Sequence, residues 1–163
     1  GVALVLEVAE HGEDGDDVSI GGRDRDHIDG GDDDDELFGG RGADKINGGD
    51  DDDKIFGERG NDSLEGGDGN DMIDGGIGRD SIDGGEGDDM LEGGGGRGTF
   101  IFAETFGNDT IVDFRANRDE LEFEGDVELE FEDQEDGVVI TVSGDAQGTI
   151  TLVDVFEDDL TFV

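Results

Sequence analysis

Aspartate recurs at every ninth position between residues 26 and 89. The members of this series are Asp26, Asp35, Asp44, Asp53, Asp62, Asp71, Asp80 and Asp89. Each one follows a short glycine-rich stretch, and a tight turn in that stretch would expose its backbone carbonyls. Carboxylate and carbonyl oxygens are the ligands that calcium prefers, and it takes about six to eight of them in flexible geometry. The spacing therefore predicts a row of calcium sites.

Other metals fit these residues less well. Magnesium demands near-octahedral geometry and keeps several of its waters. Zinc and the other transition metals favour cysteine and histidine, but the chain has no cysteine, and its only histidines are His11 and His27. His27 stands where other copies of the pattern have Glu, Lys, Ser or Met, so we interpret it as a solvent-exposed strand residue.

The aspartates belong to a nine-residue unit that is repeated eight times from Gly21 to Glu92 without insertion or deletion. Asp is always at position six, and Gly is always at position one. Position two is Gly except at Glu58, and position eight is always Ile or Leu. A fixed period of this kind predicts a stacked repeat architecture.

Each unit predicts a turn followed by a very short strand. Gly, and next to it Asp or Asn, best tolerates the positive φ angles of a tight turn, which fits positions one to four. The next strand-forming segment is three residues long, with one aliphatic side chain facing inward and two neighbours facing outward. If two units make one coil, the strands of odd and even units lie on opposite sides and the Ile and Leu side chains meet between them. The predicted fold class is therefore all-β, a parallel solenoid.

In such a coil, aspartates that are 18 residues apart meet at the same edge. One edge would pair Asp26, Asp44, Asp62 and Asp80, and the other would pair Asp35, Asp53, Asp71 and Asp89. Two turns together would complete a coordination shell, so eight units predict about six calcium ions or more.

The charge of the chain restricts its partners. It carries 50 acidic and 10 basic residues, for a formal net charge of -40, and this self-repulsion opposes collapse. A core of one aliphatic residue in nine is too thin to offset it, so we predict that the block folds only with a cation. The charge excludes nucleic acid as a partner and disfavours an anionic membrane surface. The longest apolar run, Val2 to Leu6, is too short to span a bilayer, and we expect a monomer.

The unit resembles GGxGxDxUx, the glycine-rich nonapeptide of repeats-in-toxin (RTX) proteins, where U is a large aliphatic residue. The resemblance implies a right-handed parallel β-roll that binds calcium between turns two units apart and is disordered until calcium binds. It also implies that backbone carbonyls near positions two and four join the aspartates as ligands. These positions are Gly22, Asp24, Gly31, Asp33, Gly40, Gly42, Gly49, Asp51, Gly60, Gly67, Gly69, Gly76, Gly78, Gly85 and Gly87. Glu58 departs from the pattern, and we expect a weaker site at its turn.

Two flanking segments differ from this block. Residues 1–20 predict a strand from Val2 to Ala9 and a degenerate unit with Gly12 and Asp17 but with Ser19 in place of Ile or Leu. The β-roll is expected over residues 21–98, and its last unit has Gly98 where the aspartate should be.

Residues 99–163 predict a β-rich cap. Its expected strands are 110–114, 120–124, 127–132, 138–142 and 149–153, where acidic or Thr residues alternate with apolar ones. Eight of the ten Phe residues lie at or beyond Phe100. We expect the cap to bury Phe102, Phe114, Phe123, Phe131 and Phe156.

The cap resembles the region after the repeats in secreted RTX proteases, lipases and alginate-modifying enzymes. The resemblance rests on DTIVDF at 109–114 and on Arg118, Asp119, Glu120 and Leu121. The final residues, EDDLTFV, are similar to the uncleaved C-terminal signal of type I secreted proteins, whereas the N-terminus lacks the basic region of a secretory signal peptide. The resemblance implies a calcium-dependent folding and secretion module of a larger extracellular protein, exported by a type I secretion apparatus.

The sequence also bears on two other functions, an enzyme and a structural or adhesive spacer. The chain has no HExxH or GxSxG motif and no cysteine nucleophile, so we expect catalysis to belong to another domain. A calcium-stiffened structural or adhesive spacer stays open, although there is no Trp or Tyr to stack on a sugar ring and Phe is expected in the cap. The acidity would also suit a salt-rich habitat, which the sequence does not distinguish from calcium binding.

Overall fold

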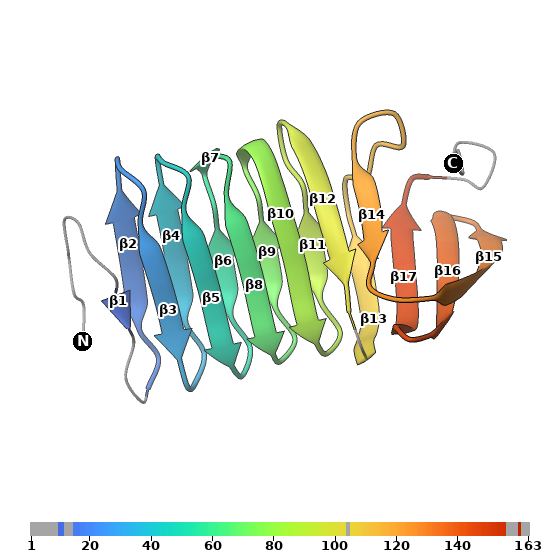
Figure 1. Cartoon of the computed structure of the whole chain (residues 1–163), viewed down its shortest axis with the longest axis horizontal. Coiled ribbons are helices and arrows are strands. Elements are labelled where there is room, and N and C mark those ends of the chain that lie inside the picture. Colours follow the sequence, from blue (N-terminus) through green and yellow to red (C-terminus); the bar gives the residue numbers. More distant parts are fainter. Residues whose placement is uncertain (1–9, 12–14, 104, 156–159, 161–163) are drawn as a thin grey trace.

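The computed structural model describes residues 10–11, 15–103, 105–155 and 160. The predicted strand from Val2 to Ala9, Gly12, Phe156 and most of the EDDLTFV tail lie outside these residues. The described residues form 17 strands and no helix, wound into an elongated coil (Figure 1). They accordingly include no helix of the length and apolarity that would carry it across a membrane.

The coil is built from two sheets that run along its length. The first contains β1 (Glu10–His11), β3 (His27–Gly31), β5 (Lys45–Asp50), β8 (Ser63–Asp68), β10 (Ile77–Glu86), β12 (Arg97–Phe102) and β14 (Glu120–Phe123), and β7 (Arg59–Gly60) pairs with β10. The second contains β2 (Val18–Gly22), β4 (Glu36–Gly40), β6 (Lys54–Phe56), β9 (Met72–Asp74), β11 (Met90–Glu92) and β13 (Thr105–Ile111), followed by β17 (Gln147–Val153), β16 (Gly137–Gly144) and β15 (Val127–Gln134). This is the parallel β-roll that the repeat predicts, with odd and even units in opposite sheets.

The register confirms the 18-residue coil. Ile28 lies opposite Ile46, and Ile46 lies opposite Leu64, within parallel strands. The position-eight side chains of the eight units are at most 2% exposed and form one continuous core between the sheets. Each coil contributes one buried side chain from each sheet, so the core of the repeat block consists of two facing columns of Ile and Leu.

The turns lie along two long edges of the coil. The upper edge in Figure 1 carries the turns of the odd units, at 22–26, 40–44, 58–62, 76–80 and 94–98. The lower edge carries the turns of the even units, at 31–35, 49–53, 67–71 and 85–89.

Several strands in both sheets are longer than the predicted three residues, and β2 and β4 of the second sheet have five residues each. β6, β9 and β11 do have three residues, but β3 has five and β5 and β8 have six. The longer strands continue through the two glycines of the following unit, and Gly31 lies opposite Gly49 in the ladder. The prediction was too short because the glycines were assigned to the turn alone.

Parallel stacking also continues beyond residue 98. The expected boundary between residues 98 and 99 falls inside β12, which pairs with β14, and β11 pairs with β13. β13 begins at Thr105 and ends at Ile111, so the strand expected at 110–114 starts earlier and ends sooner. Among the described strands, the antiparallel pairs are β15 with β16 and β16 with β17, at the right-hand end of Figure 1, whereas β17 also pairs in parallel with β13.

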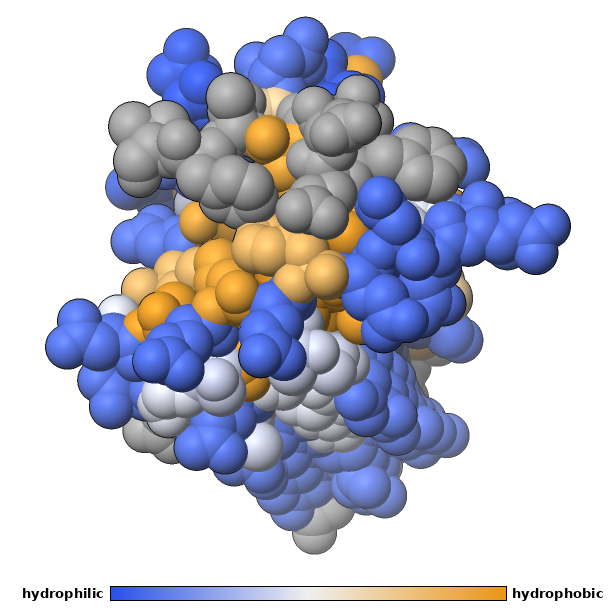
Figure 2. All heavy atoms as spheres, turned by 90° about the vertical axis from the view of Figure 1, so that its right-hand side faces the viewer, coloured by the Kyte–Doolittle hydropathy of each residue, from blue (hydrophilic) through white to orange (hydrophobic). Residues whose placement is uncertain are grey.

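Aromatic and aliphatic side chains close this end of the core. Phe102 and Phe114 are buried as predicted, whereas Phe123 and Phe131 are only partly buried. Phe100 and Phe106 are fully buried as well, and the ring centroids of Phe102 and Phe106 are 4.7 Å apart. Apolar side chains gather on the end face (Figure 2), around a cavity of about 480 Å³. The aliphatic and aromatic residues that line it include Phe114, Leu121, Phe123, Leu129, Phe131 and Ile140.

Two phenylalanines lie outside the cap, contrary to the expectation that Phe sits there. Phe38 and Phe56 are neighbours on the outer face of β4 and β6, with ring centroids 5.0 Å apart and planes 11° from parallel. They occupy position nine of their units, whose side chains point away from the core.

Candidate metal centres

The position-six aspartates join successive coils through one carboxylate oxygen. On the lower edge, the backbone N–H of Asp35 donates to Oδ1 of Asp53 at 2.7 Å, 18 residues later in the chain. On the upper edge, the N–H of Asp26 donates to Oδ1 of Asp44 at 2.8 Å. The same contact recurs along both edges, so each edge carries a carboxylate ladder as predicted from the 18-residue spacing.

The second oxygen of each carboxylate is buried and has no hydrogen-bond partner among the described residues. This holds for Oδ2 of Asp26, Asp35, Asp44, Asp53, Asp62, Asp71, Asp80, Asp89 and Asp109. A buried carboxylate oxygen without a donor carries its full desolvation cost, so native proteins rarely leave one unpaired. Nine such atoms along the two edges call for a cation or a proton beside each of them.

A backbone carbonyl faces the same space as this oxygen. A Cβ atom added at Gly30 would overlap both Oδ2 of Asp35 and the carbonyl oxygen of Gly48 in the next coil. Equivalent pairs of oxygens surround the position-one glycines further along, such as Gly48 and Gly66. Two oxygen acceptors from successive coils therefore lie close together beside each of these glycines, and a hard cation near them would offset their repulsion.

Position one is glycine because of this lack of space. Positive φ angles, which we expected across the whole turn, begin at position two: Gly31 has a φ of 116° and Gly49 one of 123°. Glu58 also has a positive φ, of 64°, so this position keeps the sign of φ despite the substitution. Its turn differs from the others in containing the short strand β7.

The structure places the predicted position-two and position-four residues in the turns, next to the following coil. Carbonyls of this kind approach the backbone of the next coil closely: a Cβ at Gly49 would overlap the Gly31 carbonyl, and one at Gly69 the Asp51 carbonyl. Asp33 and Asp51 adopt positive φ, whereas Asp24 does not. The side chains of all three are exposed to solvent, so their backbone carbonyl oxygens, and not their carboxylates, are the candidate ligands for an ion in the turn.

Side chains alone do not make a coordination shell here. In the described part of the chain, no group of three or more His, Asp or Glu side chains is placed to hold one ion. Calcium accepts backbone carbonyls as readily as carboxylates, so the arrangement suits calcium better than metals that need several side-chain ligands.

Burial raises the pKa of eight of the ladder carboxyl groups, because desolvation disfavours their charged form. These groups belong to Asp35, Asp44, Asp53, Asp62, Asp71, Asp80, Asp89 and Asp109. The pKa rises to about 6 for Asp53, Asp80 and Asp89 and to about 7 for Asp71. For Asp109 it rises to about 8. The backbone hydrogen bond on Oδ1 opposes the rise, and nearby carboxylates add to it. Without a metal the coil would therefore bury carboxyl groups that keep their protons up to near-neutral pH.

Three further aspartates belong to the ladders. Asp17 donates its N–H to Oδ1 of Asp35 at 2.7 Å, and Ser19 of the same degenerate unit is buried. At the other end, the N–H of Asp89 donates to Oδ1 of Asp109 at 3.1 Å, and that of Gly98 donates to Oδ1 of Asp119 at 2.9 Å.

Sequence reasoning placed Asp17 in a degenerate unit but did not count Asp109 and Asp119 as site residues. A signal for Asp109 exists, because residues 107–111, GNDTI, match positions four to eight of the unit. The spacing of 20 residues from Asp89 takes it out of phase. Asp119 lies 21 residues beyond Gly98, and nothing in the period points to it.

Comparison with known protein families shows which family these repeats belong to. The model of the RTX calcium-binding nonapeptide repeat, which describes four copies at a time, matches residues 11–46, 29–64, 47–82 and 65–100. The chain belongs to this family. Its RTX repeats are calcium-binding repeats, and their matched region covers the aspartates of both carboxylate ladders from Asp17 to Asp89.

A solved structure, that of a lipase, shows similarity in fold. The extracellular lipase LipA from Serratia marcescens is 22% identical, with a TM-score of 0.57 over 92% of this chain, which spans 38% of the lipase chain. The AlgE6R3 subunit of the Azotobacter vinelandii mannuronan C5-epimerase is 23% identical, with a TM-score of 0.27, over 94% of this chain and 84% of the subunit. No curated protein sequence matches the chain.

Proposed function

We propose that the RTX chain is a calcium-dependent folding module of a larger exported protein, disordered where calcium is scarce and folded where it is abundant. The observation that carries this proposal is the set of nine buried aspartate oxygens, along two edges of the coil, that have no hydrogen-bond donor among the described residues. Calcium beside them would neutralise the carboxylates and join the two coils that supply the oxygens.

Without calcium, charge repulsion and a small hydrophobic core both disfavour the folded state. The net charge of -40 repels itself, and the ladders bring carboxylates 18 residues apart into register. The core gains only one buried Ile or Leu for each nine residues that must be ordered. Binding free energy then becomes folding free energy, because the ligands come together only in the folded coil.

This coupling suits export. A cytosol poor in calcium would keep the chain extended enough for a narrow channel such as that of a type I secretion apparatus, and calcium at about millimolar concentration outside would fold it. Similarity to part of an extracellular lipase supports a place within a larger secreted protein. We assign no catalytic role to this chain, because its well-placed carboxylates are committed to the ladders, and we place any catalysis in another domain.

Circular dichroism tests the proposal. The chain is measured in chelator, in about millimolar calcium, and in magnesium at the same ionic strength, which controls for charge screening. Calcium alone should produce the strand signal, and chelator should abolish it. A strand signal of full size in chelator, or an equal one in magnesium, would show that folding does not depend on calcium.

A calcium-stiffened adhesive spacer is the second candidate, and one observation favours it. Phe38 and Phe56 form an aromatic pair on the outer face of the roll, partly open to solvent. Binding to a glycan array that is lost in Phe38→Ala, with folding unchanged, would support this role. Without such binding, the pair is a cross-strand contact that stabilises the sheet.

A further inference from the structure

The two edges of the roll differ sharply in charge. The four lower-edge turns carry 13 carboxylates and no basic residue. The five upper-edge turns carry six carboxylates and six arginines. These arginines are Arg23, Arg25, Arg41, Arg59, Arg79 and Arg97. Apart from Arg115 and Arg118, they are all the arginines of the chain.

The coil stacks the upper-edge arginines into a row. Arg41 lies opposite Arg59 across a parallel bridge, and Arg79 lies opposite Arg97 within the ladder of β10 and β12. Their side chains are exposed. The buried geometry beneath them matches that of the lower edge, since the Asp44–Asp62 and Asp53–Asp71 contacts are both 2.8 Å long. The edges thus offer similar cradles in opposite electrostatic surroundings.

We infer that the roll has two classes of calcium site, a tighter class along the lower edge that fills first and a weaker class along the upper edge. This inference rests on calcium binding in the turns, as the proposed function does. Thirteen carboxylates attract a divalent cation, whereas six arginines cancel the attraction of six carboxylates. The buried ligands are alike on the two edges, so the difference in affinity comes from the surrounding exposed charges, and we expect the classes to differ about tenfold or more.

Calorimetric titration of the full chain with calcium tests the inference with two matched pairs of variants. The first pair is Asp53→Asn on the lower edge and Asp44→Asn on the upper edge, both buried and equally hydrogen-bonded. Asp53→Asn should remove ions from the tight class, and Asp44→Asn from the weak class.

The second pair neutralises exposed residues at position three, outside the buried cradles. Arg41→Gln with Arg59→Gln should strengthen the weak class about tenfold, and Asp50→Asn with Asp68→Asn should weaken the tight class by a similar factor. One class of site in the parent chain, or shifts of the same sign in both double variants, would overturn the inference. Folding in chelator would refute the proposed function and still leave the two classes measurable.

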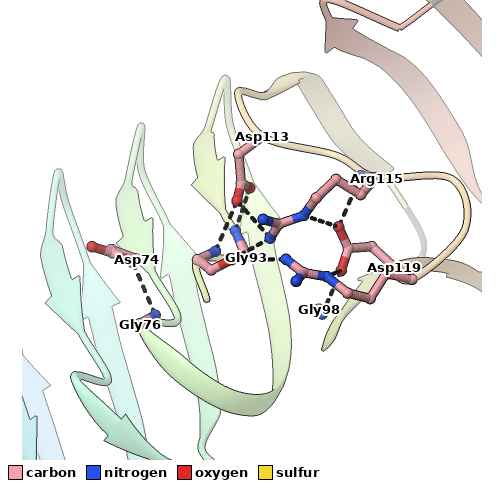
Figure 3. Close-up of polar contacts among 9 residues, drawn as sticks. Asp74, Gly76, Gly93, Gly98, Asp113, Arg115 and Asp119 are labelled. Carbon is pink, nitrogen blue, oxygen red and sulfur yellow. Dashed lines mark hydrogen bonds and ion pairs between the residues drawn. The ribbon is translucent and has the colours of Figure 1, made fainter. Parts of the chain in front are cut away.

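A separate observation concerns the last upper-edge turn, at Gly94–Gly98. Gly98 supplies no carboxylate, and Asp119, from a later segment, accepts its N–H. The guanidinium of Arg115 bonds Asp119 at 3.4 Å and Asp113 at 3.1 Å, and Asp113 accepts the N–H groups of Gly93 and Gly94 (Figure 3).

Both arginines of this region reach the same backbone oxygen. Arg115 and Arg118 donate to the carbonyl of Gly94, which occupies position two of its unit. The guanidinium of Arg115 therefore lies among the carboxylates of Asp113 and Asp119 and the carbonyl of Gly94, where it supplies the positive charge. We propose that this turn is closed by Arg115 and Arg118 and takes no calcium.

Arg115→Gln tests this second proposal, with the exposed Arg97→Gln as its control. At saturating calcium, Arg115→Gln should raise the equilibrium constant for unfolding in urea about tenfold or more, because it leaves buried Asp119 without its closest cation. The number of calcium ions bound should not change. An extra ion bound by Arg115→Gln with stability retained would show that calcium can close the turn, and unchanged stability and stoichiometry would show that the contact is incidental.

Discussion

The backbone N–H of Asp53 donates to Oδ1 of Asp71 at 2.8 Å, across 18 residues of sequence and one coil of the roll. The other oxygen of Asp71 is buried beside the carbonyl of Gly84 and has no donor among the described residues. One side chain thus both aligns successive coils and offers an oxygen to a cation. This double role explains why position six is never anything but aspartate in the eight units.

Replacing Asp71 should separate its two roles. Asp71→Asn keeps an acceptor for the Asp53 N–H but loses the charge, whereas Asp71→Ala also leaves that N–H unpaired. We expect both variants to need more calcium to fold, and Asp71→Ala to be less stable than Asp71→Asn by about 1–3 kcal/mol. Urea unfolding at saturating calcium measures the difference. Glu132→Ala, on the exposed face of β15, is the control, and equal stability of the two Asp71 variants would contradict the ladder.

The lack of space at position one can be tested with a single methyl group. Gly66→Ala would place its Cβ against Oδ2 of Asp71 and the carbonyl of Gly84, and we expect a loss of about 1–3 kcal/mol. Gly95→Ala meets nothing closer than Ile77 Cγ1 at 3.4 Å and should change stability by less than about 0.5 kcal/mol. Unfolding in urea at fixed calcium compares them. A neutral Gly66→Ala would mean that the two oxygens can move apart freely.

Acid should partly replace calcium. The pKa of Asp71 rises from 3.8 to about 7 in the folded coil, and that of Asp53 to about 6. A raised folded pKa adds stability that is fully present below the unfolded value near 3.8 and is lost as pH rises through about 6 to 7. Metal-free chain should therefore gain strand signal on acidification.

The same protons should compete with calcium. We expect calcium to bind the folded coil more weakly as pH falls from about 7 towards 5, where the carboxyl groups of Asp71 and Asp53 take up protons. The calcium concentration at half-folding should nevertheless fall over this range, because the protons stabilise the metal-free coil while the carboxyl groups of the unfolded chain stay ionised. Circular dichroism in calcium-depleted buffer and calcium titrations at several pH values follow both effects. A metal-free chain that stays equally unstructured at all these pH values would contradict the first expectation.

The core prediction concerns a single position-eight residue. Ile73 is 1% exposed and is paired in register with Ile55 and Leu91 in the neighbouring coils. Ile73→Ala should cost about 2–5 kcal/mol at saturating calcium, because the gap it leaves interrupts the column. Ile77→Ala, at a residue that is 58% exposed, should change stability by less than about 0.5 kcal/mol. Similar losses for both variants in urea unfolding would argue against a core of one column per sheet.

The sequence by itself determined the parts of this protein that repeat. Ile28 opposite Ile46, and Asp26 joined to Asp44, follow from a nine-residue period read as two units per coil. These contacts could be predicted because each unit meets a copy of itself, so one local pattern fixes every register along the coil. The same regularity identified the carboxylates that line both edges.

Only the tertiary structure decided what depends on two different segments meeting. Gly30 must be glycine because Oδ2 of Asp35 and the carbonyl oxygen of Gly48 lie where a Cβ atom would be. The turn pattern in the sequence does not predict this crowding. Asp119 reaches Gly98 across 21 residues, and Arg115 then takes the place beside it, because the chain between them leaves the nine-residue period. The sequence lists the positions of the arginines, but it does not show that they lie side by side. They do so because the coil places alternate turns on opposite edges, which brings Arg41 opposite Arg59 and Arg79 opposite Arg97.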